Sequence, residues 1–302
     1  MCTDLKSTKI WPKCLDTICN LQLSMSLFIS SLNSGSNGNC YYIGNDREAV
    51  LIDAGLSCRE IETRMAGLGL EMSKLKAVFI SHEHKDHISG LPVLAKKYQL
   101  PVYITEGTQK DGHVRIDKHL VNRFSQEETI QIGELSIHSF PKNHDAGDPH
   151  SFMICYGKIA VGIFTDIGSV CQPLIEHFSK CSAAFLEANY DEEMLINGGY
   201  PYFLKKRITD GRGHLSNKQA LELFCSHRSP YMSHLILSHL SKNNNCPHLV
   251  KDLFSPHSRN TEIIVASRYA ATPLYEITST MPYREKIKKS MLNKQQQQLS
   301  LF

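Results

Sequence analysis

The chain has 302 residues, of which 41% are apolar and 21% are charged, so it can bury the core of one large or two small domains. Its net charge of +3, with histidine counted as neutral, is too small to identify a nucleic-acid-binding protein by charge alone. No stretch approaches the ~20 consecutive apolar residues of a membrane span, so we expect no membrane partner. The fifteen histidines are more informative, because histidine is the commonest metal ligand.

The two ends of the chain differ from its middle. Polar residues interrupt any apolar signal-peptide core in residues 1–24, so we expect a poorly ordered N-terminal extension and no export. Residues 276–302 are basic and glutamine-rich and predict a mobile tail. The ten cysteines include no C-x-x-C pair, which indicates a reduced, cytoplasmic protein without a disulfide framework. Residues 25–275 remain as one folded domain.

Short apolar runs in this domain predict β-strands. The predicted strands cover residues 26–32, 40–44, 49–53, 76–81, 101–104, 128–132, 135–140, 151–156, 159–165, 183–187, 234–238 and 261–266. Early strands follow one another closely, whereas helices separate the later ones. This order indicates two sheets packed face to face with helices outside, an αββα sandwich of the α/β class.

Helices are predicted between some of these strands, over residues 57–68, 89–98, 171–179 and 217–227. Two of them begin with the pattern of a capping box, in which a serine and a side chain three residues later satisfy free N–H groups. These patterns are Ser57 with Glu60 and Ser216 with Gln219.

The segment SHEHKDHISG, from Ser81 to Gly90, concentrates ionisable side chains after a predicted strand. Side chains at positions i and i+2 of an extended chain point the same way, so His82 and His84 project together from the strand end. The chain then turns towards a helix, where Asp86 and His87 can face a second point nearby. Mixed nitrogen and oxygen ligands suit Zn²⁺ or Mn²⁺ better than Ca²⁺. We therefore predict a metal site here.

The spacing H-x-H-x-D-H after a strand resembles the signature of the metallo-β-lactamase-fold hydrolases, and the resemblance extends over about residues 25–275. It implies two divalent cations per chain, Zn²⁺ or Mn²⁺ with Fe also possible. Further ligands are expected in PKNHDAGDPHSF, GIFTDIG and HLILSHLS. The resemblance assigns the ligands to two groups that share a bridging Asp166: His82, His84 and His144 for one metal, and Asp86, His87 and His239 for the other.

Three further residues bear on this assignment. His150 competes with His144, but we assign His144 because it directly follows the strand-like LSIHSFPKN. His138 lies inside that strand and is expected to pack against its neighbours. Asp53 ends AVLIDAG and matches a position in this fold where a carboxylate orients ligand histidines. Without the resemblance, Asp53 is a loop aspartate that precedes a helix.

The segments between the later ligands point to one branch of this family. The interval from Asp166 to His239 is too short for the β-CASP domain of the large nucleases. FLEANYDEEML and RGHLSNKQA are similar to segments of phosphodiesterases that include tRNA 3′-processing nucleases. By analogy Glu187 orients His214, which protonates the departing oxygen, and together with Asp86 they form the expected catalytic group. Without that analogy, Glu187 is a strand-end carboxylate and GHLS a helix entry.

The motifs LNSGSNGNCYYI, DAG, SHEHKDH and GHLSN together are most similar to the YycJ/WalJ group of bacterial exonuclease-like proteins. This resemblance implies a nucleic-acid substrate, double-stranded DNA degraded from 5′ to 3′. The glycines of SGSNGN either present N–H groups to a phosphate or only form a hairpin. Four basic residues near His214 contact a nucleic-acid backbone or form a solvated face: Lys205, Lys206, Arg207 and Arg212.

Other functions use the same residues. An RNA or small-molecule (cyclic) phosphodiesterase, or a lactone or thioester hydrolase, would need the same cations. A metal-containing adaptor without catalysis would be expected to lack one or more ligands, and this chain has the full set.

Overall fold

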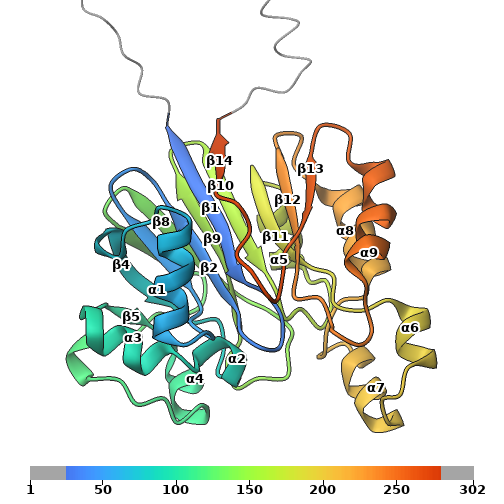
Figure 1. Cartoon of the computed structure of the whole chain (residues 1–302), viewed down its shortest axis with the longest axis horizontal. Helices are drawn as coiled ribbons and strands as arrows, with labels where there is room; N and C mark the ends of the chain where they lie inside the picture. Colours follow the sequence, from blue (N-terminus) through green and yellow to red (C-terminus); the bar gives the residue numbers. More distant parts are fainter. Residues whose placement is uncertain (1–24, 280–302) are drawn as a thin grey trace, which may run out of the picture.

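The computed structural model describes residues 25–279, which form two mixed β-sheets covered by helices (Figure 1). The first sheet has the strand order β14-β1-β2-β3-β4-β5-β6. Its strands are β1 (Ser26–Asn33), β2 (Cys40–Gly44), β3 (Ala49–Ile52), β4 (Leu75–Phe79), β5 (Val102–Tyr103), β6 (Val121–Asn122) and β14 (Tyr275–Thr278). Strands β3 to β6 are parallel, and the others pair antiparallel.

The second sheet has the strand order β13-β12-β11-β10-β9-β8-β7. Its strands are β7 (Thr129–Ile132), β8 (Leu135–Pro141), β9 (His150–Tyr156), β10 (Ile159–Phe164), β11 (Ala183–Glu187), β12 (His234–Ser238) and β13 (Glu262–Val265). Strands β10 to β13 are parallel, whereas β7 to β10 pair antiparallel. Parallel strands need crossover connections, and helices supply them here.

Helices cover the outer faces of both sheets (Figure 1). The helices of the described residues are α1 (Cys58–Gly67), α2 (Lys85–Ile88), α3 (Leu91–Tyr98), α4 (Glu106–Asp111), α5 (Gln172–Phe178), α6 (Glu192–Asn197), α7 (Tyr202–Thr209), α8 (Asn217–His227) and α9 (Pro247–Phe254). Helices α6 and α7 lie beyond the sheets, at the lower right of Figure 1. Met65 of α1 joins an apolar cluster outside the first sheet, and Phe224 of α8 joins one outside the second. Phe79 and Phe152 meet in a third cluster between the sheets. Three apolar interfaces between four layers confirm the αββα sandwich.

Strand β10 shows how the sequence specifies its place between two cores. All six residues of IAVGIF are buried. Ile159, Val161 and Ile163 belong to the cluster between the sheets, whereas Ala160 and Phe164 belong to the outer cluster. Side chains alternate between the faces of a strand, so a continuous apolar run is what a strand covered on both faces requires.

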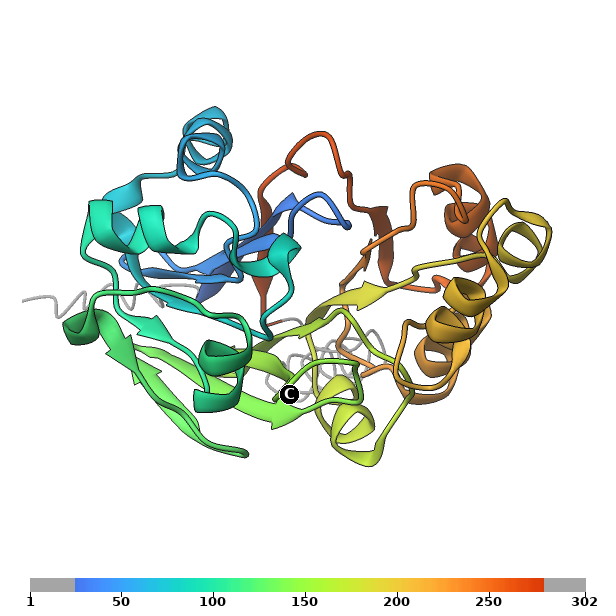
Figure 2. The ribbon, with the colours of Figure 1, turned by 90° about the horizontal axis from the view of Figure 1, so that it is seen from below.

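The parallel strands of both sheets end at one edge of the sandwich, the lower edge in Figure 1, which Figure 2 views from below. Asp53 follows β3, and Glu187 ends β11. Asp166 and His239 come just after β10 and β12. The carboxyl ends of parallel strands are the usual place for a ligand site in such sheets, because loops with polar side chains gather there.

Two helix predictions need correction. The helix expected over 89–98 begins two residues later, as α3, and a break at Ser89 and Gly90 separates it from the short helix α2. A Cβ at position 90 would lie 1.7 Å from the carbonyl oxygen of Leu56, so the glycine permits a close backbone contact that the break creates. The second correction concerns the capping box predicted at the start of α1. The Ser57 hydroxyl accepts from the Glu60 N–H, but the Glu60 carboxylate pairs with Arg64 and does not complete the box. The capping box at Ser216 forms in full.

Several short elements were not predicted: α2, α4, α6, α7, α9, β6 and β14. Strands β6 and β14 lie at the two edges of the first sheet, and β6 has only two residues. Such elements depend on pairing with a neighbouring strand more than on their own apolar pattern. Strand β14 also crosses the domain boundary that was expected at residue 275.

The predictions for residues 1–24, and for the tail from residue 280 on, lie outside the described residues. Within residues 25–279, no helix combines the length and the apolarity needed to cross a membrane. The cysteines in this part of the chain are free thiols: Cys40, Cys58, Cys155, Cys171, Cys181, Cys225 and Cys246.

Candidate metal centre

Three strand ends turn sharply where the predicted site residues lie. Asp53, Asp166 and His239 have φ angles of 62°, 57° and 56°. Residues other than glycine rarely adopt this left-handed conformation, because it costs roughly 1–3 kcal/mol and must be held by the surrounding structure. Non-glycine residues in this region cluster at functional sites, and all three of these side chains are buried at the shared edge of the sheets.

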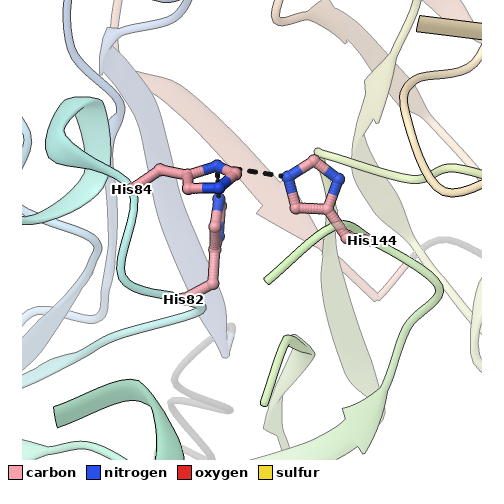
Figure 3. Close-up of side chains that lie close together, drawn as sticks. All are labelled: His82, His84 and His144. Atoms are coloured by element: carbon pink, nitrogen blue, oxygen red, sulfur yellow. Dashed lines mark hydrogen bonds between the residues drawn. The ribbon is translucent and has the colours of Figure 1, made fainter. Parts of the chain in front are cut away.

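The first predicted ligand group comes together from two separate loops (Figure 3). Nδ1 of His84 lies 3.0 Å from Nε2 of His82 and 3.3 Å from Nε2 of His144. Nitrogen ligands about 2.0–2.1 Å from a tetrahedral Zn²⁺ stand roughly 3.3 Å from one another. The three ring nitrogens therefore have the spacing of a metal-ligand set.

The second group lies beside the first. Oδ2 of Asp86 is 3.6 Å from Nε2 of both His87 and His239. Asp166 lies between the groups, with Oδ2 3.2 Å from Nε2 of His87 and Oδ1 3.9 Å from Nε2 of His144. Oδ2 of Asp166 and Nε2 of His239 are buried without a hydrogen-bond partner. Buried polar atoms normally have a partner, so this arrangement fits a bound cation.

Four of the five histidines use their Nδ1 atoms for contacts on the protein side. Nδ1 of His82 contacts Ser81 Oγ, and that of His144 contacts the carbonyl oxygen of Gly213. The equivalent atoms of His87 and His239 contact buried carboxylates. Each contact fixes the ring and leaves Nε2 for the centre, as outer partners of metal-ligating histidines do.

Two carboxylates are the fixed partners of these imidazoles. Asp53 is fully buried, and its Oδ2 lies 2.7 Å from Nδ1 of His87 and accepts a 2.8 Å hydrogen bond from Ser81 Oγ. Its Oδ1 accepts from the N–H of Ser81. The contact with His87 is the one that the resemblance implied. Since the same carboxylate also holds the backbone at Ser81, Asp53 ties the end of β3 to the ligand loop after β4.

Electrostatics separates the histidines into two classes. Burial lowers the pKa of His82 well below its usual value and lowers the pKa of His144 to about 3, so both are neutral, as metal binding requires. Burial also lowers the pKa of His87, but the carboxylates of Asp166, Asp53 and Asp86 outweigh it and raise the value to about 10. The second group therefore carries an excess of carboxylate charge, which attracts cations.

The predicted pair of Glu187 and His214 also forms. Nδ1 of His214 donates to Oε1 of Glu187 at 2.7 Å, because an ionised carboxylate can only accept. Oε2 accepts from the N–H groups of Ile167 and Leu215. Burial raises the pKa of Glu187, but His214 and His239 lower it to about 2, so the carboxylate is ionised. Nε2 of His214 remains available to the pocket that this residue lines.

The same side chains can be grouped in another way. Ligand atoms of Asp166, Glu187, His214 and His239 all lie within 4.8 Å of one another, so this set can also hold a cation. Oε1 of Glu187 already contacts both His214 and His239 at 2.7 Å and 3.1 Å, however. A substitution of His214 followed by a measurement of bound metal separates the two assignments.

A pocket of about 230 Å³ opens over these residues and is called the metal pocket below. It is lined by Ser36, His84, Asp86, Asp145, Asp166, Asn189, Tyr200, Leu204, Arg207, Ile208, Gly213, His214, His239 and Ser241. Of the four predicted phosphate contacts, Arg207 alone lines it, with Nε 2.6 Å from Oδ2 of Asp145. Lys205 donates to the carbonyl oxygen of Ile196, and Lys206 and Arg212 are exposed elsewhere.

The two other histidines considered in the sequence, His150 and His138, lie outside these groups. His150 is buried at the start of β9, with its ring against Phe124 and its Nδ1 3.0 Å from the carbonyl oxygen of Asp148. His138 lies in β8 and contacts Thr129 Oγ1. Neither belongs to any of the described clusters that can hold a metal.

The glycine-rich segment forms the turn between β1 and β2, and it supplies a residue that was not predicted. Asn39 places its Nδ2 3.1 Å from Oδ2 of Asp86 and 3.0 Å from Nε2 of His87. Its backbone N–H donates to the carbonyl oxygen of Asp86 and its carbonyl accepts from Gly55. A Cβ at position 55 would lie 1.7 Å from that Asp86 oxygen. The only sign of this role in the sequence was that the glycine-rich segment SGSNGN ends in an asparagine, Asn39.

Two more charged residues were missed. Asp145 follows the ligand His144, and Oδ1 lies 3.5 Å from the ligand's Nε2. Lys142 is buried beneath the site and donates to the carbonyl oxygen of Thr165 at 2.8 Å, and burial lowers its pKa. Both stand within three residues of His144 in PKNHDAG, but nothing in that segment indicates which way either side chain points.

Comparisons with known proteins identify the family of this chain. The family model described as "Beta-lactamase superfamily domain" matches residues 48–239. The exodeoxyribonuclease YycJ of Bacillus anthracis is 32% identical over 263 residues, which cover 85% of this chain and 97% of that protein. The exodeoxyribonuclease WalJ of Streptococcus pneumoniae is 33% identical over 225 residues, which cover 73% of this chain and 84% of that protein.

Solved structures share the fold at lower identity. The metallo-β-lactamase fold protein YhfI of Bacillus subtilis has a TM-score of 0.64 at 18% identity and covers 83% of this chain and 99% of its own. The short form of human tRNase Z has a TM-score of 0.57 at 15% identity. The match covers 84% of this chain and 100% of that protein. At 32% identity across nearly all of YycJ the relationship extends beyond a shared fold, and the chain belongs to the β-lactamase superfamily, as a metal-dependent hydrolase related to YycJ and WalJ.

Proposed function

We propose that the protein is a cytoplasmic two-metal phosphodiesterase that removes nucleotides from the 5′ ends of double-stranded DNA. The observation that carries this proposal is the contact between Glu187 and His214 on the wall of the metal pocket. Cleavage of a phosphodiester expels an alkoxide, which is a poor leaving group until it receives a proton. An imidazole held by a buried carboxylate beside the candidate ligands suits that task.

The chain supplies a place for each part of the reaction. A bound pair of Zn²⁺, Mn²⁺ or Fe ions would lower the pKa of a water to about 7 and neutralise charge on the phosphate. The ligand histidines would hold these ions through ring nitrogens already fixed by their outer partners, and Asp86 and Asp166 would supply carboxylate oxygens. His214 would give its Nε2 proton to the departing oxygen, which contributes typically 10²–10⁴-fold.

Two observations support DNA as the substrate. YycJ and WalJ are both named exodeoxyribonucleases, and this chain covers 97% and 84% of their lengths. Arg207 is a guanidinium on the wall of the metal pocket, where it can meet a backbone phosphate. Lys205, Lys206 and Arg212 lie near it in the chain and would act on the flanking backbone.

End-labelled nucleic acids test the proposal directly. The purified protein is incubated with Mn²⁺, Zn²⁺ or Mg²⁺ and with duplex DNA, single-stranded DNA or RNA, each labelled at the 5′ or the 3′ end. We expect the 5′ label of duplex DNA to be released first, as mononucleotides or short products. The His84→Ala variant should release none, and the His138→Ala variant, which changes a half-buried histidine outside the site, should behave like the wild type.

Small substrates decide between the alternatives. Turnover of bis-p-nitrophenyl phosphate without degradation of DNA would indicate a small-molecule phosphodiesterase, and degradation of RNA in place of DNA would indicate a ribonuclease. Turnover of a thioester or a lactone, with no cleavage of any phosphodiester, would contradict the proposal.

A further inference from the structure

A second pocket, of about 310 Å³, opens beside the metal pocket and is called the Arg268 pocket below. One wall consists of Leu240, Ser241 and Lys242, the three residues that follow the candidate ligand His239. Ser241 lines both pockets. The Arg268 pocket therefore adjoins the site of the proposed reaction.

Another part of the lining is residues 265–269, the last residue of β13 and the loop that follows it, and backbone contacts hold this loop in place. The N–H of Ser34 donates to the carbonyl oxygen of Ser267, and Nδ2 of Asn37 donates to that of Arg268 at 2.8 Å. Nη2 of Arg64 donates to the carbonyl oxygen of Tyr269. These contacts fix the loop without using the side chains of Arg268 and Tyr269.

The charge of this pocket is opposite to that of the metal pocket. No aspartate or glutamate lines it, whereas three aspartates line the metal pocket. Lys242 and Arg268 line it, and no carboxylate among residues 25–279 forms an ion pair with either of them. Nη1 of Arg268 is buried without a hydrogen-bond partner. A guanidinium in this state favours an anionic ligand, because phosphate oxygens satisfy its donors.

The remaining lining is suited to a flat apolar group. Leu240, Val265 and Ala266 contribute apolar surface, and Asn245 adds an amide. The ring of Tyr269, a residue that is 72% exposed, stands at the pocket on a fixed backbone. Aromatic rings of this kind stack on bases, and a pocket of this volume is at the small end of the range for organic ligands.

We propose that the Arg268 pocket binds the nucleotide next to the scissile phosphate, with its phosphate on Arg268 and Lys242 and its base against Tyr269. This inference rests on the proposed phosphodiesterase function and extends it. Because the two pockets meet at Ser241, a strand can place one phosphate at the metal ligands and its neighbour in the Arg268 pocket. A substrate with only one phosphate cannot use both.

This difference provides the test. Arg268→Ala, Lys242→Ala and Tyr269→Ala are compared with Lys158→Ala, an exposed lysine in the turn between β9 and β10, at the opposite end of β10 from Asp166. We expect Arg268→Ala to raise the KM for oligonucleotides roughly tenfold or more. The kcat/KM for bis-p-nitrophenyl phosphate should stay within about twofold of the wild type. Tyr269→Ala should weaken oligonucleotide binding roughly five- to tenfold.

A binding measurement keeps the inference separate from the proposed activity. Fluorescence polarisation of a labelled oligonucleotide is measured on the His84→Ala background, with and without Arg268→Ala and with and without Lys242→Ala. Weaker binding in both double variants supports the pocket, even if the nuclease panel fails. Unchanged binding in both, or an equal loss of activity on oligonucleotide and bis-p-nitrophenyl phosphate, overturns it. Lys242 is exposed, so its replacement should leave the thermal unfolding midpoint unchanged.

Discussion

The floor of the metal pocket and its rim are built in different ways. The floor is the buried layer at and beneath the pocket, with Asp53, His87 and Asp166, whose side chains are 0–2% exposed. Asp53 and Asp166 follow strands β3 and β10 of the two sheets, and His87 lies in α2. The rim is the segment that contains α7 and His214. Arg207 on this segment is 59% exposed and His214 is 23% exposed, and α7 contains no buried residue.

This difference in burial separates metal binding, in the floor, from contact with the substrate, at the rim. The floor inherits its positions from the packing of two sheets, so its geometry cannot change without disturbing the core. The rim depends on little burial, so its residues can change while the fold remains. We therefore expect substitutions in the floor to act on metal binding, and substitutions in the rim to act on the substrate and on the proton that the leaving group receives.

The largest effect is expected in the floor, at Asp166. Asp166→Asn removes the charge of the carboxylate that lies between the two ligand groups, and kcat/KM for DNA should fall by at least roughly a thousandfold. Metal per chain, measured by mass spectrometry of the metals, should fall with it. Asp252→Asn, on the exposed face of α9, is the matched control. Full metal content and activity in Asp166→Asn would remove this residue from the centre.

The next effect is expected at the rim, at His214. His214→Ala should lower kcat for DNA roughly 10²–10⁴-fold, because the alkoxide then leaves without a proton from the protein. Its effect on bis-p-nitrophenyl phosphate should be much smaller, since p-nitrophenolate leaves without protonation. Metal content should not change. Equal losses on both substrates, together with a loss of metal, would identify His214 as a ligand instead.

A smaller effect is expected at Asp53, a floor residue that contacts the candidate ligand His87 on the side away from the centre. Asp53→Asn keeps the shape of the side chain but removes the charge that Nδ1 of His87 contacts at 2.7 Å. Metal affinity, measured by competition with a chelator, should fall roughly 10–100-fold. Activity should return when the metal concentration is raised. Activity that stays low at saturating metal would show that Asp53 acts in another way.

The smallest effect is expected at Arg207. Arg207→Ala removes one cation from the rim and frees Asp145, so the KM for DNA should rise a few-fold and its dependence on salt should weaken. The free energy of unfolding should stay within about 0.5 kcal/mol of the wild type, because the side chain is mostly exposed. A large loss of stability would mean that the rim is more firmly packed than α7 indicates.

The sequence predicted those parts of the molecule that depend on local spacing. The seven-residue segment from Ser81 to His87 carries four candidate ligands, and the apolar run over residues 159–165 predicted the strand β10. The resemblance was needed for His144, Asp166 and His239, because each stands in its segment without the dense ligand spacing of SHEHKDH. Their convergence depends on the pairing of strands far apart in the chain.

The rest depended on contacts that no single segment contains. Asn39 was missed because its role comes from the approach of the β1–β2 turn to the loop after β4. The break before α3 was missed because it occurs where Gly90 closely approaches the carbonyl oxygen of Leu56, more than thirty positions earlier in the chain. Short edge strands such as β14 carry too little pattern of their own and form by pairing with β1.

Gly55 limits how this protein can be redesigned. Its backbone lies against both Asn39 and the carbonyl oxygen of Asp86, and a single methyl group there would overlap that oxygen. Three segments of the chain, which contain Asn39, Gly55 and Asp86, therefore meet at one point where no additional side-chain atom fits. A library aimed at a new metal or a new substrate should keep position 55 as glycine and vary the walls of the two pockets, where side chains can be exchanged without moving a ligand.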